Sequence, residues 1–188
     1  MHRTVTPLIT VVLLLVALGM LVLMSASSER SVDASYFVQR QLIWLLLSAV
    51  AAILTARLDY RFYEKALIPL ALASIILLIL VRIPGIGKMV NGSWRWIQVG
   101  PMTIQPSEFA KPVFIIVMAW WLSRSLRRID EIRYGVAIPF VLLSCFALPI
   151  LVEPDYGTTI LISAVGICLM LIAGARVGPL SAVAGVGL

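Results

Sequence analysis

Residues 91–111 read Asn-Gly-Ser-Trp-Arg-Trp-Ile-Gln-Val-Gly-Pro-Met-Thr-Ile-Gln-Pro-Ser-Glu-Phe-Ala-Lys, and they hold most of the varied chemistry of the chain. Long apolar runs lie on either side of this stretch. A second, smaller polar island follows at residues 153–158, which read Glu-Pro-Asp-Tyr-Gly-Thr. We expect the apolar runs to hold these two islands at the same membrane surface.

The composition is that of an integral membrane protein. Of the 188 residues, 61% are hydrophobic and only 13% are charged, and the mean hydropathy is +1.04. A soluble domain is about half apolar and about a quarter charged, so this chain has too little polar surface to coat a soluble particle. The net charge of +6 is not gathered in a basic block with interleaved aromatics, which excludes nucleic acid as a partner.

Six apolar runs are candidates for membrane spans, because a helix that crosses a bilayer needs about 20 apolar residues. The first run could be a signal peptide, but the five later runs favour a retained span. Val177 starts a further apolar stretch of the kind that begins a seventh span. The six runs occupy residues 7–24, 41–56, 66–81, 109–123, 134–152 and 156–175.

The fold class that follows is all-α: a polytopic membrane helix bundle with six transmembrane helices and a truncated seventh, forming one membrane domain over residues 1–188. The cations are densest at residues 124–133, and the positive-inside rule then places the N-terminus in the cytoplasm. With this orientation both polar islands face outward. Cys145 and Cys168 lie inside apolar runs, and we expect both to be small buried side chains.

The sequence Gln105-Pro106-Ser107-Glu108 is typical of a helix start, since proline suits the first helical position and an acid suits the first turn. Lys111 lies three residues after Glu108, on the same helix face. This pattern indicates either a capped helix with a local ion pair or a substrate-binding pair at the membrane edge. In the second case the cation would suit an anionic group such as a pyrophosphate.

Arg95 lies between Trp94 and Trp96. The tryptophans are typical of an interfacial aromatic belt. In an extended segment, however, the two indoles point one way and Arg95 points the other, which leaves Arg95 able to bind a phosphate or a carboxylate.

Asp155 is a favoured residue for the N-cap of the sixth helix, and this is the simpler interpretation. Alternatively, Glu153 and Asp155 are acids of a substrate cleft, where two carboxylates shift each other's pKa or hold a cation. The common sequence motifs of soluble hydrolases, metalloproteases, ATPases and dehydrogenases are absent from the chain. We predict no metal-ligating residues.

Three motifs in this order resemble the signature series of the FtsW/RodA/SpoVE (SEDS) family: Asn-Gly-Ser-x-Arg-Trp-Ile, Gln-Pro-Ser-Glu-x-x-Lys and Pro-Asp-x-Gly-Thr. The resemblance covers the whole chain as the N-terminal half of such a protein. Residues 25–28 and 36–41 lean towards the division branch, FtsW.

The resemblance implies a peptidoglycan glycosyltransferase of the bacterial cytoplasmic membrane, which polymerises lipid II into glycan strands at the outer face during division or elongation. It implies a class B penicillin-binding transpeptidase as partner and a divalent cation, Mg or Mn, as cofactor. It also implies substrate-binding roles for the residues that match the motifs, which are Arg95, Trp96, Gln105, Ser107, Glu108, Lys111 and Asp155.

One departure concerns catalysis. The best candidate for the family's general base is an aspartate in a large outer loop that would lie beyond Leu188, so we expect this chain alone to be catalytically incomplete. A transporter or flippase for a lipid-linked precursor and a non-catalytic scaffold for a transpeptidase remain as alternatives.

Overall fold

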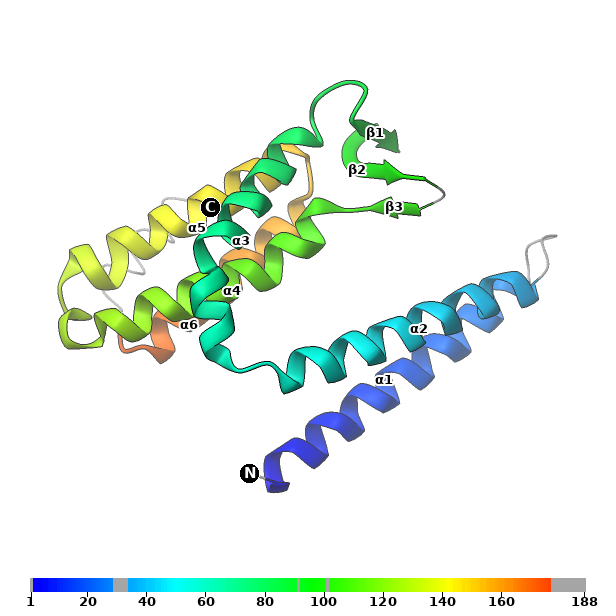
Figure 1. The fold of residues 1–188 in the computed structure, drawn as a ribbon, viewed down its shortest axis with the longest axis horizontal. Helices are drawn as coiled ribbons and strands as arrows, with labels where there is room; N and C mark the ends of the chain where they lie inside the picture. The colour runs from blue at the N-terminus through cyan, green and yellow to red at the C-terminus, as the bar shows by residue number, and fades with distance from the viewer. Residues whose placement is uncertain (1, 29–33, 91, 101, 177–188) are drawn as a thin grey trace. The chain divides into compact units, whose positions relative to one another are not determined.

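The computed structural model describes residues 2–28, 34–90, 92–100 and 102–176 (Figure 1). The chain divides into two compact units, Met1–Leu58 and Asp59–Leu188, which are treated separately below. The first unit contains α1 (His2–Ser28) and α2 (Ala34–Arg57). The second contains α3 (Tyr60–Leu80), β1 (Gly87–Val90), β2 (Ser93–Val99), β3 (Met102–Ile104), α4 (Pro106–Ser125), α5 (Ile138–Val152) and α6 (Tyr156–Ile172).

The described helices confirm a polytopic helical membrane protein. Five spans are long and apolar enough to cross a bilayer: Thr6–Ser25, Val38–Arg57, Tyr60–Leu80, Pro106–Arg128 and Arg133–Val152. The expected sixth span is α6, whose 17 residues reach only the lower limit for crossing. The expected start of a seventh span lies outside the described residues, so the count of six and a part of a seventh stays a prediction, as does a single membrane domain over 1–188.

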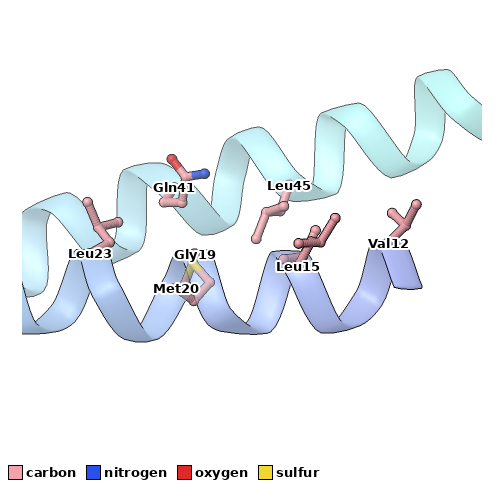
Figure 2. Close-up of a pocket in the computed structure, with 8 residues that line it drawn as sticks. Val12, Leu15, Gly19, Met20, Leu23, Gln41 and Leu45 are labelled. Atoms are coloured by element: carbon pink, nitrogen blue, oxygen red, sulfur yellow. The ribbon is translucent and has the colours of Figure 1, made fainter. Parts of the chain in front are cut away.

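In the first unit, α1 and α2 pack along each other and leave an open groove of about 410 Å³ between them (Figure 2). Gln41 is the only polar side chain among the described residues that line this groove, and the rest of the lining is apolar. The outward faces of both helices are also apolar and exposed, which is what a helix pair surrounded by lipid requires.

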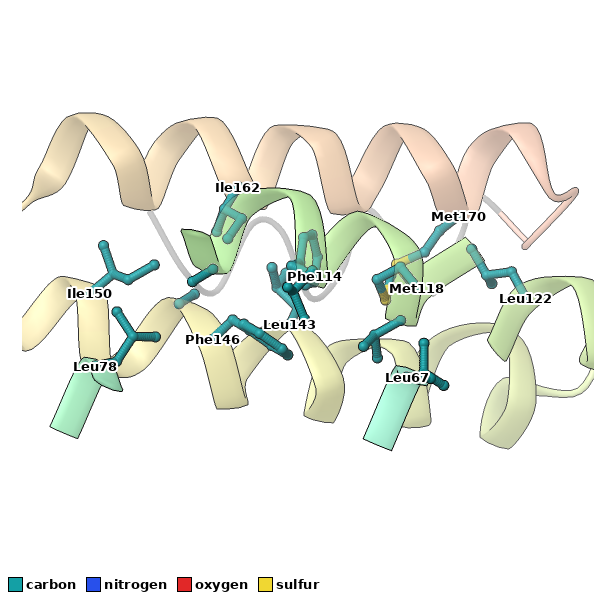
Figure 3. Packing of buried hydrophobic residues seen from close by; sticks show 14 of the residues in the cluster. Leu67, Leu78, Phe114, Met118, Leu122, Leu143, Phe146, Ile150, Ile162 and Met170 are labelled. Carbon is teal, nitrogen blue, oxygen red and sulfur yellow. The ribbon is translucent and has the colours of Figure 1, made fainter. Parts of the chain in front are cut away.

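In the second unit, α3, α4, α5 and α6 enclose a core centred on Phe114, whose side chain is fully buried (Figure 3). The Phe114 and Phe146 ring centroids are 5.6 Å apart. Gly166 on α6 lets the Phe114 ring approach closely, because a Cβ at that position would lie 3.1 Å from Phe114 Cζ. Cys145 and Cys168, expected to be buried, are exposed instead, because they lie on the outward faces of α5 and α6.

The stretch between α3 and α4 is a three-stranded antiparallel sheet in the order β1-β2-β3. Trp96 lies opposite Lys88, and Ile97 lies between Gly87 and Ile104. Gly100, between β2 and β3, has a φ of +60°, a conformation that glycine adopts without strain. The sequence indicated only a polar island here, so the sheet is an addition to the predicted all-helical architecture (Figure 1).

The glycine that opens β1 is expected to tolerate no side chain. A Cβ on Gly87 would lie 1.8 Å from the carbonyl oxygen of Val81, which belongs to the backbone and has little freedom to retreat. We therefore expect Gly87→Ala to displace β1 and to increase proteolytic cleavage of residues 87–104. Met89→Ala, an exposed position on the same strand, is the control. Equal cleavage of the two variants would contradict the prediction.

Candidate functional site at the sheet and the α5–α6 turn

The start of α4 has the features that the sequence predicted. Pro106 occupies the first turn, and Glu108 is the acid of that turn. Lys111 Nζ donates a hydrogen bond to Glu108 Oε1 at 2.8 Å, which confirms the expected pair. The Glu108 side chain is 60% exposed and the Lys111 side chain 26% exposed, so the lysine is the more enclosed partner and still reaches the surface.

Arg95 on β2 binds the turn between α5 and α6. Its Nε donates to the backbone oxygen of Glu153 at 3.0 Å and to Ser93 Oγ at 2.7 Å. Its Nη2 donates to the backbone oxygen of Pro154, and its Nη1 lies 3.9 Å from Asp155 Oδ1. The guanidinium is thus occupied by acceptors of the protein itself, whereas the sequence had left it free for a ligand.

Two further side chains support the same attachment. Ser93 Oγ donates to the backbone oxygen of Glu153 at 2.6 Å, and Arg82, just after α3, donates to the backbone oxygen of Val152. We call the bonds from Arg82, Ser93 and Arg95 to the α5–α6 turn the turn clasp. The clasp joins the two polar islands, which confirms that the fold holds them at one end of the second unit.

Asp155 caps α6, as the simpler interpretation predicted. Its Oδ1 accepts from the backbone N–H of Thr158 at 3.2 Å, and its Oδ2 accepts from Thr158 Oγ1 at 2.9 Å. Gln105 Nε2 donates to the same Oδ2 at 3.1 Å. Asp155 therefore links the residue before α4 to the start of α6 and lies beside Arg95.

Glu153 has an unusual environment. Its side chain is 1% exposed, and neither carboxylate oxygen has a hydrogen-bond partner in the described part of the chain. Burial, and then the charge of Asp155, raise the pKa of Glu153 to about 8, although Arg82 and Arg95 oppose the shift. Glu153 is therefore mostly a neutral acid at neutral pH.

The seven residues expected to bind substrate are distributed unevenly over this end of the unit. Gln105 donates a hydrogen bond to Asp155, and the guanidinium of Arg95 lies 3.9 Å from the same carboxylate, while Glu108 and Lys111 form a separate pair. Ser107 is fully buried, and its hydroxyl has no partner among the described residues. Trp96 is half-buried on β2, and Asn91 of the first motif lies outside the described residues. Substrate contact by these residues stays a prediction.

Sequence reasoning missed the roles of Arg82 and Ser93 and the burial of Glu153. Ser93 was within the first motif, but its partner is a backbone oxygen 60 residues later, which no sequence signal reveals. The one sequence signal for the role of Arg82 is its position, since it is a cation directly after the apolar run of residues 66–81.

An apolar cavity of about 260 Å³ lies at this end of the unit, between α3, the sheet and α4. It is lined by Leu77, Ile97, Val99, Ile104, Pro106 and Phe109. By contrast, the groove of Figure 2 contains none of the predicted site residues. Among the described residues, no group of three His, Cys, Asp or Glu side chains is placed to hold a metal ion.

The fold and the site define a class: a multi-pass helical membrane protein whose polar motifs meet at one end of its helix bundle. The profile of the cell cycle protein family of FtsW, RodA and SpoVE matches residues 5–188, and the chain belongs to this family. The family and the helices together make it a multi-pass protein of the bacterial cytoplasmic membrane.

Curated relatives carry the FtsW name, in agreement with the expected lean towards that branch. The probable peptidoglycan glycosyltransferase FtsW of Trichlorobacter lovleyi is 37% identical over 174 residues, which is 90% of this chain and 45% of that protein. The protein of the same name from Thioalkalivibrio sulfidiphilus is 38% identical over 169 residues, 88% of this chain and 42% of the relative. The chain thus spans less than half the length of these relatives.

Solved structures support the fold. The rod shape determining protein RodA of Thermus thermophilus matches with a TM-score of 0.66 and 25% identity, over 84% of this chain and 54% of that one. A chain from a structure of a peptidoglycan synthase complex matches with a TM-score of 0.70 and 24% identity, over 90% of this chain and 52% of that one.

Proposed function

We propose that the protein containing this chain is a peptidoglycan glycosyltransferase that polymerises lipid II into glycan strands at the outer face of the cytoplasmic membrane. The observation that carries the proposal is the meeting of the family motifs at one end of the bundle. Arg95 from the first motif and Gln105 from the second both contact Asp155 from the third. This chain would supply part of the substrate site.

Lys111 is our candidate for contact with the pyrophosphate of the lipid substrate. Its ammonium is held by Glu108 and is still accessible. In the reaction, a sugar hydroxyl attacks the anomeric carbon of the donor, and the bond to the pyrophosphate breaks. The hydroxyl proton passes to a base that we expect beyond residue 188. A fixed cation beside the departing pyrophosphate stabilises the charge that develops there.

Arg95 has a different role in this proposal. Its donors are taken by the α5–α6 turn, so it shapes the cavity by fixing the sheet. The contacts of Arg95 favour this role over the direct binding of a phosphate or a carboxylate. The apolar cavity beside Pro106 and Phe109 offers space for part of a lipid tail at the same end of the bundle.

The reaction is tested with the natural full-length protein in lipid vesicles, with lipid II supplied on one face. We expect glycan polymer and released lipid pyrophosphate. Movement of lipid II across the bilayer without polymer would instead support a transporter, and the absence of both would favour a scaffold.

Lys111→Ala is expected to lower polymerisation at least about a hundredfold while the protein still inserts into the membrane, because the leaving pyrophosphate loses its cation. Lys111→Arg, which keeps the charge, should retain part of the activity. Lys88→Ala, an exposed lysine on β1, is the matched control and should be close to the wild type. Wild-type polymer yield from Lys111→Ala would remove this residue from the site.

Two further elements of the proposal come from the family resemblance. We propose a class B penicillin-binding transpeptidase as partner, which co-purification with the full-length protein would test. We also propose that a divalent cation supports activity, tested by chelation and by restoring Mg or Mn. None of the residue roles above depends on that cation.

A further inference from the structure

Glu153 is a buried acid that the proposed reaction does not use. It is the first residue of the α5–α6 turn, where the guanidinium of Arg95 binds its backbone oxygen and not its carboxyl group. Both carboxyl oxygens are without a hydrogen bond to any described residue, and the side chain is 1% exposed. A buried acid in these surroundings is tolerated only in its neutral form, because an isolated buried carboxylate is very costly.

The charged groups that act on Glu153 come from three elements. Asp155, the cap of α6, disfavours a second negative charge, while Arg82 after α3 and Arg95 on β2 favour one. Glu108 and Lys111, on α4, pair with each other. The balance leaves the pKa of Glu153 at about 8.

Ionisation of Glu153 would make its carboxylate compete with backbone oxygens of the turn for the same arginine donors. The cations that favour a Glu153 carboxylate are Arg82 and Arg95, and both already donate to backbone oxygens of residues 152–154. If Arg95 moves to the carboxylate, the backbone oxygens of Glu153 and Pro154 lose their charged partner. The carboxylate therefore gains its bonds at the expense of those that attach the sheet.

We propose that Glu153 is a proton-operated latch: the neutral acid permits the turn clasp to hold the sheet on the α5–α6 turn, and loss of the proton to water loosens it. This inference rests on the contacts of the turn and is independent of the proposed glycosyltransferase activity. The sheet carries Trp96 and leads into α4, so the latch would act on the geometry of that whole end of the unit.

The test is amide hydrogen exchange of the natural full-length protein in detergent, corrected for the intrinsic effect of pH. Between about pH 6 and about pH 10, we expect protection of the β2 amides, residues 93–99, to fall about tenfold or more. The fall should level off above about pH 8, because Glu153 is then ionised in both the clasped and the loosened states. Amides in the middle of α5 should keep their protection and serve as the internal reference.

Glu153→Gln places a neutral side chain of similar shape at the turn, and it should keep β2 protected at both pH values. Glu131→Gln is the matched control, because Glu131 is exposed, and its hydrogen bond with Arg128 lowers its pKa. That variant should respond to pH like the wild type.

Constant β2 protection in the wild type would overturn the latch, and so would a Glu153→Gln variant that loosens over the same pH range as the wild type. If Glu153→Gln fails to accumulate, the wild-type titration decides, since loosening of β2 without loosening of α5 is the signature of the latch.

Discussion

Arg95→Ala in the full-length protein is expected to free the sheet from the α5–α6 turn and to reduce the proposed glycan polymerisation at least about a hundredfold, since displacing reactive groups by about 1 Å has effects of this size. Arg95 supplies the two charge-assisted bonds to the backbone oxygens of Glu153 and Pro154 and lies beside Asp155. Hydrogen bonds to charged groups contribute about 1.5–3 kcal/mol each. Because 32% of the side chain is exposed, we expect a total loss of about 3 kcal/mol for the attachment of the sheet.

The loss of the sheet's attachment should be local, and this distinguishes the effect of Arg95→Ala from general misfolding. The core around Phe114 does not include Arg95, so the Arg95→Ala protein should reach the membrane in near-normal amount. Arg95→Lys keeps the charge but lacks the planar fork that reaches several acceptors, so we expect an intermediate result. Arg124→Ala is the control, because this exposed arginine pairs with Glu64 and takes no part in the bonds of the turn clasp. Normal β2 protection and normal polymer yield from Arg95→Ala would refute the clasp.

Phe114→Ala is expected to have the largest effect on stability. The Phe114 ring is fully buried against Phe146 and against the bare backbone of Gly166. Truncation of a buried phenylalanine costs about 3–5 kcal/mol, through lost contacts and the cavity that remains. Helices in a membrane associate by close packing, so the cavity term applies here as well.

Thermal unfolding of the detergent-solubilised full-length protein measures this effect. Phe114→Leu leaves a smaller cavity and should cost about half as much or less. The neighbouring Ile115 is 42% exposed, so Ile115→Ala should be nearly neutral. Equal destabilisation by Phe114→Ala and Ile115→Ala would show that the core is not centred where the structure places it.

Local sequence signals predicted the local structure well. The apolar runs indicated the helices, Pro106 and Glu108 marked the start of α4, and Asp155 was expected to cap α6. These features depend on neighbours within four residues, so composition and spacing reveal them. The pair of Glu108 and Lys111 is of the same kind.

The features that the sequence could not predict depend on distant partners. An arginine between two tryptophans is typical of a ligand-binding site, but the acceptors of Arg95 are backbone oxygens 58 and 59 residues away. Glu153 was considered as one of two acids of a substrate cleft, and only the packing of the turn shows that its side chain is buried. The sheet was missed because residues 87–104 contain three glycines and a proline, which obscure the alternation of short strands.

The turn clasp recognises main-chain oxygens at Val152, Glu153 and Pro154. Every residue type presents the same carbonyl group, so the clasp does not distinguish among side chains at positions 152 and 154. We therefore expect Val152 to accept varied replacements, whereas Arg82, Ser93 and Arg95 accept few. Tolerance to mutation would then be asymmetric across a single contact, strict on the donor side and permissive on the acceptor side.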